Sequence, residues 1–155
     1  MTPMSAINPF DLKTALLARH AQHVVLVHFP IALFITGVAF DVIAIWKGSR
    51  SLAAAAYYNV LAAAISALPT VATGLLAWQL LLGGARLRGN LRLHLILALV
   101  STAAIWLVWS LHFRAQRKHQ TLSPTARVIV EFAAVFLVAL TGHIGGFLSG
   151  VNGPA

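Results

Sequence analysis

Three histidines, His28, His94 and His143, lie inside or at the margin of three separate apolar segments. Each segment is long enough for a membrane helix, and up-and-down threading of such helices brings the three imidazoles to one depth near one membrane face. Imidazoles on facing helices can provide the axial ligands of haem iron. The spacing predicts a ligand ring, with His28 and His94 as the preferred pair and His143 as the alternate ligand.

We expect this ring to hold one haem b. The small residues beside the histidines would make room for the porphyrin, and they are Ala32, Gly37, Gly142, Gly145 and Gly146. Arginines on the same side could hold the propionates by charge-assisted hydrogen bonds, and they are Arg19, Arg86, Arg88 and Arg92. The chain has no cysteine, which excludes covalent c-type haem and thiolate-held iron–sulfur clusters.

Two other interpretations of the three histidines stay open. Each ring lies close to a membrane interface, where an imidazole can bond to water, lipid headgroups or another histidine at little cost. Alternatively, the three rings could form a trigonal site for zinc or copper, since both metals bind imidazole well. Such a site needs closer convergence than diagonal helices provide.

The composition places the chain in a membrane. Hydrophobic residues make up 59% of the 155 residues and charged residues only 9%. Four apolar runs, about 24–46, 52–82, 93–113 and 128–148, reach the roughly 20 residues that a spanning helix needs. We therefore expect an all-α integral membrane protein, multi-pass in a bacterial inner membrane. The four transmembrane helices of residues 24–155 would form one up-and-down bundle.

The N-terminal segment, residues 1–23, has a different pattern. Residues 8–20 alternate apolar and charged side chains after Asn8, which can cap a helix, and Pro9, which can open one. This pattern predicts an amphipathic helix that lies in the membrane interface. We see no cleavage site for a signal peptide and expect the first span to direct insertion.

The net charge of +8 comes from Lys and Arg residues that flank the apolar runs. This distribution indicates anchors for lipid headgroups and predicts no nucleic-acid partner. The basic residues divide almost evenly between the two sides, so the positive-inside rule gives little guidance; we expect both termini outside. The sequence does not indicate an oligomeric state.

A second polar set lies at the depth of the opposite membrane face, and its members are Asp41, Asn59, His112 and Glu131. Ionisable residues within a bilayer normally face a partner or a cofactor. The two carboxylates could relay protons or hydrogen-bond a quinone. The simpler interpretation is a structural ion pair with Lys47, Arg50 or Arg127.

A weak internal repeat suggests two helical hairpins in tandem. Placing His28 over His94 superposes Ala32 on Ala98, Leu33 on Leu99 and Thr36 on Thr102, and the second and fourth spans share Thr-Gly at residues 73–74 and 141–142. The hairpins would be related by a pseudo-twofold axis along the membrane normal, with the first and third helices on a diagonal. Chance matches among common apolar residues are the alternative.

Several of these stretches resemble a family. They are His23 to Leu33, Phe40-Asp41, Leu68-Pro69 with Gly74 and Trp78, Arg92 with His94, and Gly142 to Leu148. They are similar to the bacterial membrane family catalogued as domain of unknown function 2231, over nearly all four spans. The resemblance departs at Val24, often proline in that family, and at His143, often tryptophan. It implies a membrane context in which similar modules are fused to Rieske or c-type cytochrome domains.

The preferred hypothesis is a b-type cytochrome-like protein that exchanges electrons with quinone or a redox partner. A cofactor-free assembly subunit of a larger membrane complex and a small transporter or proton conduit are the alternatives. No nucleophile with a paired base and no phosphate-binding loop is recognisable, so an enzyme assignment stays uncertain. The remaining histidines, His20, His23 and His119, are interpreted as surface or interfacial, with His23 as a spare ligand. Pro30 and Pro69 should kink their helices.

Overall fold

The computed structural model describes residues 19–117 and 122–149. These residues form five helices, α2 (Arg19–Leu26), α3 (His28–Lys47), α4 (Arg50–Leu81), α5 (Gly89–Gln116) and α6 (Pro124–Leu148). No strand occurs in these two described ranges. The expected all-α fold is therefore confirmed.

Four stretches of helix are long and apolar enough to cross a membrane: Gln22–Lys47, Arg50–Leu80, Gly89–Gln116 and Pro124–Leu148. They match the four predicted spans and extend most of them by a few residues. The first span includes most of α2 together with α3. The predicted interfacial helix over residues 8–20 lies outside the described residues except for its last two positions, which begin α2.

The short break between α2 and α3 has a local cause at Pro30. Proline has no N–H, so the carbonyl of Leu26, four residues earlier, receives no bond from it. The hydroxyl of Thr70 on α4 lies 3.3 Å from this carbonyl and 2.9 Å from the carbonyl of Ser66 on its own helix, so its one proton is shared between two acceptors. Pro69 lies inside α4, which continues to Leu81. The break in the first span thus lies beside a hydroxyl of the neighbouring helix.

The turn between α3 and α4 is short and well capped. Gly48 ends α3 with a φ of 63°, a left-handed conformation that glycine adopts without strain. Ser49 then caps α4, because its hydroxyl accepts a hydrogen bond from the Leu52 N–H over 3.4 Å. These two residues form the turn between the two helices of the first hairpin.

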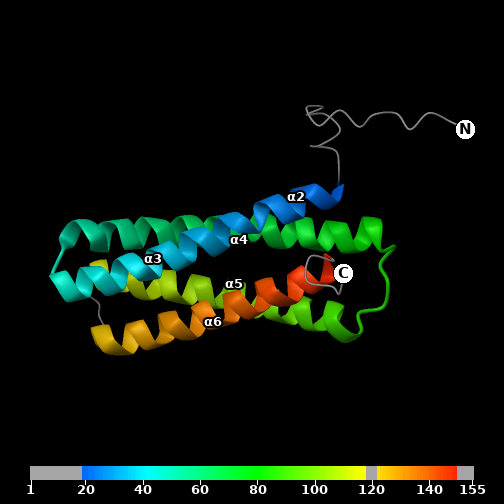
Figure 1. The fold of residues 1–155 in the computed structure, drawn as a ribbon. Helices are drawn as coiled ribbons and strands as arrows, with labels where there is room; N and C mark the ends of the chain where they lie inside the picture. The colour runs from blue at the N-terminus through cyan, green and yellow to red at the C-terminus, as the bar shows by residue number, and fades with distance from the viewer. Residues whose placement is uncertain (1–18, 118–121, 150–155) are drawn as a thin grey trace, which may run out of the picture.

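The helices form an up-and-down bundle in chain order (Figure 1). Helix α4 packs against α3 and α5, and α6 packs against α5 and α3, so α3 and α5 lie on a diagonal. The core between the helices is apolar and includes Phe34, Val38, Val60, Ile105 and Val108. The first hairpin packs closely, because a Cβ on Gly37 would lie only 2.8 Å from Val60 Cγ2.

The burial pattern reveals the internal repeat in a different register from the expected one. Each buried residue of α5 and α6 lies 71 positions after a buried residue of α3 or α4. The pairs are Pro30 and Ser101, Phe34 and Ile105, Gly37 and Val108, Asp41 and His112, Val60 and Glu131, Ala63 and Ala134, and Ala67 and Val138. The expected alignment of His28 with His94 is therefore wrong, because structurally equivalent residues must share a face as well as a depth. In the observed register His94 is equivalent to His23.

Candidate functional site

Asp41 lies near the end of α3 and is only 2% exposed. The guanidinium of Arg127, from the first turns of α6, donates hydrogen bonds to both carboxylate oxygens: Nη2 lies 2.9 Å from Oδ1 and 2.8 Å from Oδ2, and Nε lies 3.1 Å from Oδ2. This forked geometry is the strong form of an arginine–carboxylate pair. It joins the first hairpin to the second.

Glu131 lies one turn after Arg127 on α6 and is fully buried. Its Oε1 is 2.7 Å from Nε2 of His112 on α5, whose exposed fraction is 4%. The same oxygen is 3.7 Å from Nε of Arg127. The four residues Asp41, His112, Arg127 and Glu131, which we name the acidic cluster, therefore form one connected network across three helices.

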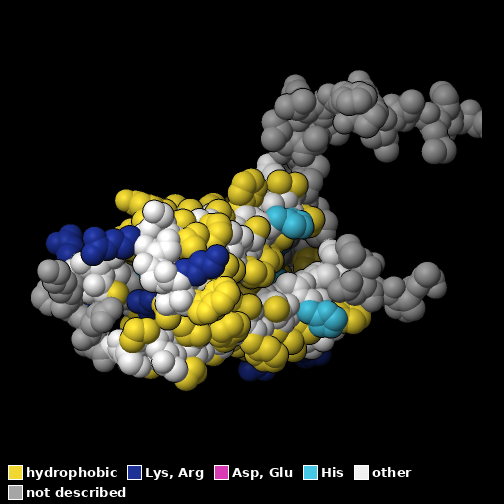
Figure 2. Space-filling view, turned by 60° about the vertical axis from the view of Figure 1, so that its left-hand side comes forward, with side chains coloured by type: hydrophobic (Ala, Val, Ile, Leu, Met, Phe, Trp, Pro, Cys, Tyr) yellow, Lys and Arg dark blue, Asp and Glu magenta, His cyan; other side chains and the backbone are white. Residues whose placement is uncertain are grey.

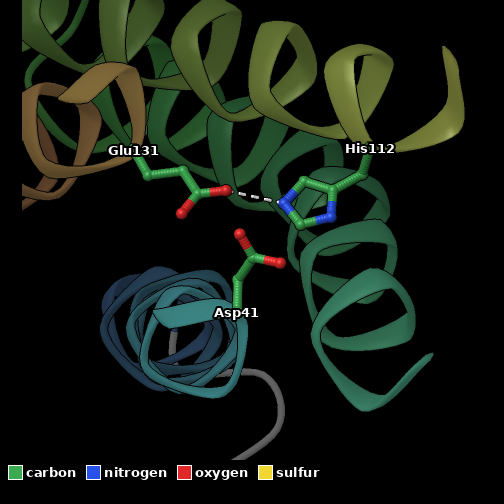
Figure 3. Close-up of side chains that lie close together, drawn as sticks. All are labelled: Asp41, His112 and Glu131. Carbon is green, nitrogen blue, oxygen red and sulfur yellow. Dashed lines mark hydrogen bonds and ion pairs between the residues drawn. The ribbon is translucent and has the colours of Figure 1, made fainter. Parts of the chain in front are cut away.

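Figure 3 shows the two carboxylates and the imidazole pointing toward a common space between the helices. One ligand atom from each of Asp41, His112 and Glu131 lies within 4.8 Å of the others. Such a set could hold a metal ion by its donor types. The Arg127 guanidinium, however, already supplies the positive charge that faces Asp41, so the described side chains form an ion-pair network by themselves.

A cavity of about 270 Å³ leads from this end of the bundle to the acidic cluster. Its lining comes from four helices and consists of Asp41, Arg50, Ala53, Ala54, His112, Ala115, Gln116 and Arg127. Figure 2 shows Lys and Arg on the surface near this end and no acidic side chain on the face in view. The cavity therefore connects a basic surface with buried carboxylates.

Asp41, His112 and Glu131, which the sequence predicts at one depth, lie close together in the structure. Asn59, the fourth predicted member, instead donates its amide to the Ala55 carbonyl of its own helix over 2.9 Å. Arg127 had been named only as one of three ion-pair partners. Its position four residues before Glu131, one helical turn away, is the signal that could have singled it out.

The three predicted haem ligands differ in their surroundings. The side chains of His28 and His143 are exposed, whereas His94 is half-buried. Nδ1 of His28 donates to the Val24 carbonyl of the preceding turn over 2.7 Å, and the ring of His143 meets that of Phe147 edge-on. In the described part of the chain the three rings do not form a three-ligand metal set, which does not support the zinc or copper interpretation. The pairing of His28 with His94 stays a prediction.

The residues expected to surround the haem also have other contacts. Gly37 packs closely against Val60, and Gly145 packs closely against the ring of His94. Arg86, Arg88 and Arg92 are exposed at the end of the bundle that contains His94, while the side chain of Arg19 lies outside the described atoms. Gly37 therefore serves helix packing, and the arginines remain accessible to an anionic group.

His23 was expected at the surface or interface, with a role only as a spare ligand, but its ring packs against α4. Its ring is half-buried, and its Nδ1 lies 3.1 Å from the carbonyl oxygen of Thr70 and 3.4 Å from Oγ1 of Thr73. In the repeat, His23, Thr70 and Gly74 are equivalent to His94, Thr141 and Gly145, each pair separated by 71 positions. The shared Thr-x-x-x-Gly spacing of α4 and α6 is the sequence signal for this equivalence.

Comparison with known proteins identifies a family. No curated protein and no solved structure matches the chain. A family model described as predicted membrane protein (DUF2231) matches residues 19–153, which include all the described helices. Four helices long and apolar enough to cross a membrane agree with that description. The chain therefore belongs to this family of predicted membrane proteins, as its resemblance in the four spans implied.

Proposed function

We propose that this multi-pass membrane protein binds and releases protons at the acidic cluster and exchanges them with one membrane face through the adjoining cavity. One observation carries the proposal: four ionisable side chains converge inside membrane-spanning helices, and three of them are almost without exposure. Ionisable groups in a bilayer are costly and usually serve ion or proton pathways. The function is that of a small proton-coupled carrier or conduit.

A cluster that served only to join the two hairpins would need fewer ionisable side chains. The Arg127–Asp41 pair alone joins the two hairpins. The cluster adds a second carboxylate and a histidine, and Oε2 of Glu131 is buried without a hydrogen-bond partner in the described part of the protein. With a neutral His112, two carboxylates face one guanidinium, so one proton on His112 or Glu131 balances the charge. This supports reversible protonation at the bond between these two side chains.

The surroundings support access from one side only. His112 contacts Glu131 and also lines the cavity, so it can pass a proton between them. Toward the opposite end, the cluster is followed by the apolar core of Phe34, Val60 and Val108. These three side chains carry no proton-accepting group, and an indole N–H of Trp106 or Trp109 beside them cannot relay a proton as a hydroxyl or carboxyl can. The arrangement therefore favours a binding step coupled to a conformational change over an open channel.

Infrared difference spectroscopy of the protein in lipid vesicles tests the proposal. Wild-type protein should show a carboxyl band that appears and disappears with external pH, and Glu131→Gln should remove it. Asn59→Ala is the matched control, because Asn59 bonds only to its own helix, and it should keep the band. Dye-monitored proton uptake by proteoliposomes should likewise be lost in Glu131→Gln and kept in Asn59→Ala. A band that survives Asp41→Asn and Glu131→Gln together, in protein with wild-type circular dichroism, contradicts the proposal.

Electron transfer through haem is the second candidate function, because a specific pair of histidines favours it at the opposite end of the bundle. This pair is His23 and His94, which occupy equivalent positions in the repeat. Exchange of electrons with quinone or with a redox protein stays a prediction.

A further inference from the structure

The two repeats place one histidine each at the same end of the bundle. His23 lies on α2, which opens the first span, and His94 lies near the start of α5, so the two rings come from helices on a diagonal. Both lie at the same end of the bundle, on opposite hairpins. We name these two residues the histidine pair. Their equivalence in the repeat and their position at one end of the bundle are independent of the acidic cluster, which lies about 27 Å away along α5, eighteen residues at 1.5 Å per residue.

The hydrogen bond of His23 sets its tautomer. A carbonyl oxygen can only accept, so Nδ1 carries the hydrogen in its bond to Thr70, and Nε2 holds the lone pair of the neutral ring. Metal-binding histidines usually show this arrangement, because a bond from one nitrogen to a backbone carbonyl orients the other toward the metal. His23 is thus prepared to ligate through Nε2.

His94 lies in the equivalent place on the second hairpin. Its ring is next to the backbone of Thr141, the equivalent of Thr70. Its Nδ1 is buried and has no hydrogen-bond partner among the residues that the structure describes. A bond from this Nδ1 to the Thr141 carbonyl, equivalent to the bond from His23 to Thr70, would leave Nε2 of His94 as the ligating nitrogen.

Each ring of the pair lies against a glycine of the neighbouring helix. A Cβ on Gly74 would be 2.9 Å from Cε1 of His23, and a Cβ on Gly145 would be 3.0 Å from Cε1 of His94. Any larger residue would displace the imidazoles. The two glycines are therefore the positions that allow the rings to lie between the helices.

We propose that the histidine pair provides both axial ligands of one haem b, held where the two hairpins come together at this end of the bundle. Two imidazoles suffice for haem iron, whose other four ligands belong to the porphyrin. A zinc ion would need further protein donors, and no third His, Asp or Glu among the described residues converges with the pair to form a ligand set. The exposed Arg86, Arg88 and Arg92 lie near His94 and suit the propionates. Figure 2 shows exposed histidine side chains at this end of the bundle. The exposed His28 and His143 therefore serve as control positions for the two proposed ligands.

Absorption spectra of protein purified from haem-replete cells test the proposal. We expect about one haem per chain, with sharp reduced bands after dithionite. His23→Ala and His94→Ala should each lose most of the haem, while His28→Ala and His143→Ala should retain it. Loss in His28→Ala with retention in His23→Ala would overturn the proposed pairing.

A second measurement keeps the proposal falsifiable if a variant folds poorly or haem is lost during purification. Haemin titrated into colourless, folded wild-type protein should give a saturable shift of the Soret band. Imidazole added to His23→Gly or His94→Gly should restore the low-spin spectrum, which a merely structural role would not produce. Folded wild-type protein that takes up no haemin, or that binds zinc ions at the pair instead, would overturn the inference without affecting the proton proposal.

Discussion

The two ends of the bundle hold their polar side chains in different ways. At the acidic cluster, Arg127 of the second hairpin bonds to Asp41 of the first, so the polar contacts cross between hairpins. At the histidine end, the bond from His23 goes to Thr70 of its own hairpin, and His94 lies beside Thr141 of the other. Buried ion pairs thus fix how the hairpins meet at one end. At the other end each hairpin orients its own histidine, which is the property expected of a site that a ligand completes.

The largest expected effect follows from removing the crossing ion pair. Arg127→Met leaves Asp41 without its partner, and loss of one member of a buried pair lowers the free energy of unfolding by about 3–5 kcal/mol. Unfolding in detergent, followed by circular dichroism, measures the change. Arg50→Met is the control, because Arg50 lines the same cavity but is exposed; it should change stability by less than about 0.5 kcal/mol. Equal losses of unfolding free energy in Arg127→Met and Arg50→Met would show that the buried ion pair does not join the hairpins at this end.

A smaller effect is expected from packing within the first hairpin. Gly37→Val forces side-chain atoms against Val60, whose Cγ2 would lie 2.8 Å from the new Cβ, and overpacking costs about 1–3 kcal/mol. Thermal unfolding measures it. Gly142→Ala is the control, because its new Cβ would meet only Ile31 Cδ1 at 3.6 Å. A stable Gly37→Val protein would show that α3 and α4 can separate without loss.

A substitution at the histidine end should change mainly the stability of the hairpin in which it lies. Thr70→Val removes the hydroxyl that lies 3.3 Å from the Leu26 carbonyl and 2.9 Å from the Ser66 carbonyl, and loss of such a hydrogen bond costs about 0.5–1.5 kcal/mol. Local hydrogen exchange should rise in α2 and leave α5 and α6 unchanged. Thr102→Val is the control, since its hydroxyl bonds only to Ala98 of its own helix. Faster exchange in both hairpins after Thr70→Val would show that this end is as firmly joined as the other.

The smallest effect is expected at His28. Its ring is exposed and bonds to a carbonyl of its own helix, so His28→Ala should change the free energy of unfolding by less than about 0.5 kcal/mol. Chemical unfolding at neutral pH measures the difference. A loss of 2 kcal/mol or more, on the order of a buried contact, would place His28 in the interior with the histidine pair.

Much of the acidic cluster was accessible from the sequence. Two carboxylates and a histidine at one depth of three different spans indicated a shared interior site, and the structure brings Asp41, His112 and Glu131 together. Asn59 was misplaced because depth alone does not say which face of α4 it occupies. Adjacent residues on a helix are rotated by about 100°, so Val60 faces the core while Asn59 bonds along its own helix.

The histidine end was harder to predict for the same reason. His23 and His28 are five residues apart, which rotates their side chains by about 140° around the helix. Either residue fits the required depth, and only the packing of α2 on α4 turns His23 inward. The repeat could have resolved the choice, but the alignment of His28 with His94 matched residue identities and did not test which helix face each residue occupies.

The sequence by itself determined that the chain has four helices long and apolar enough to cross a membrane, and where along each helix the polar residues lie. Both follow from the length and position of apolar runs, which are local properties of the chain. The tertiary structure decided which side chains face one another. Rotation about each helix axis is set by contacts such as Gly37 against Val60 and Arg127 against Asp41, between residues that are far apart in sequence.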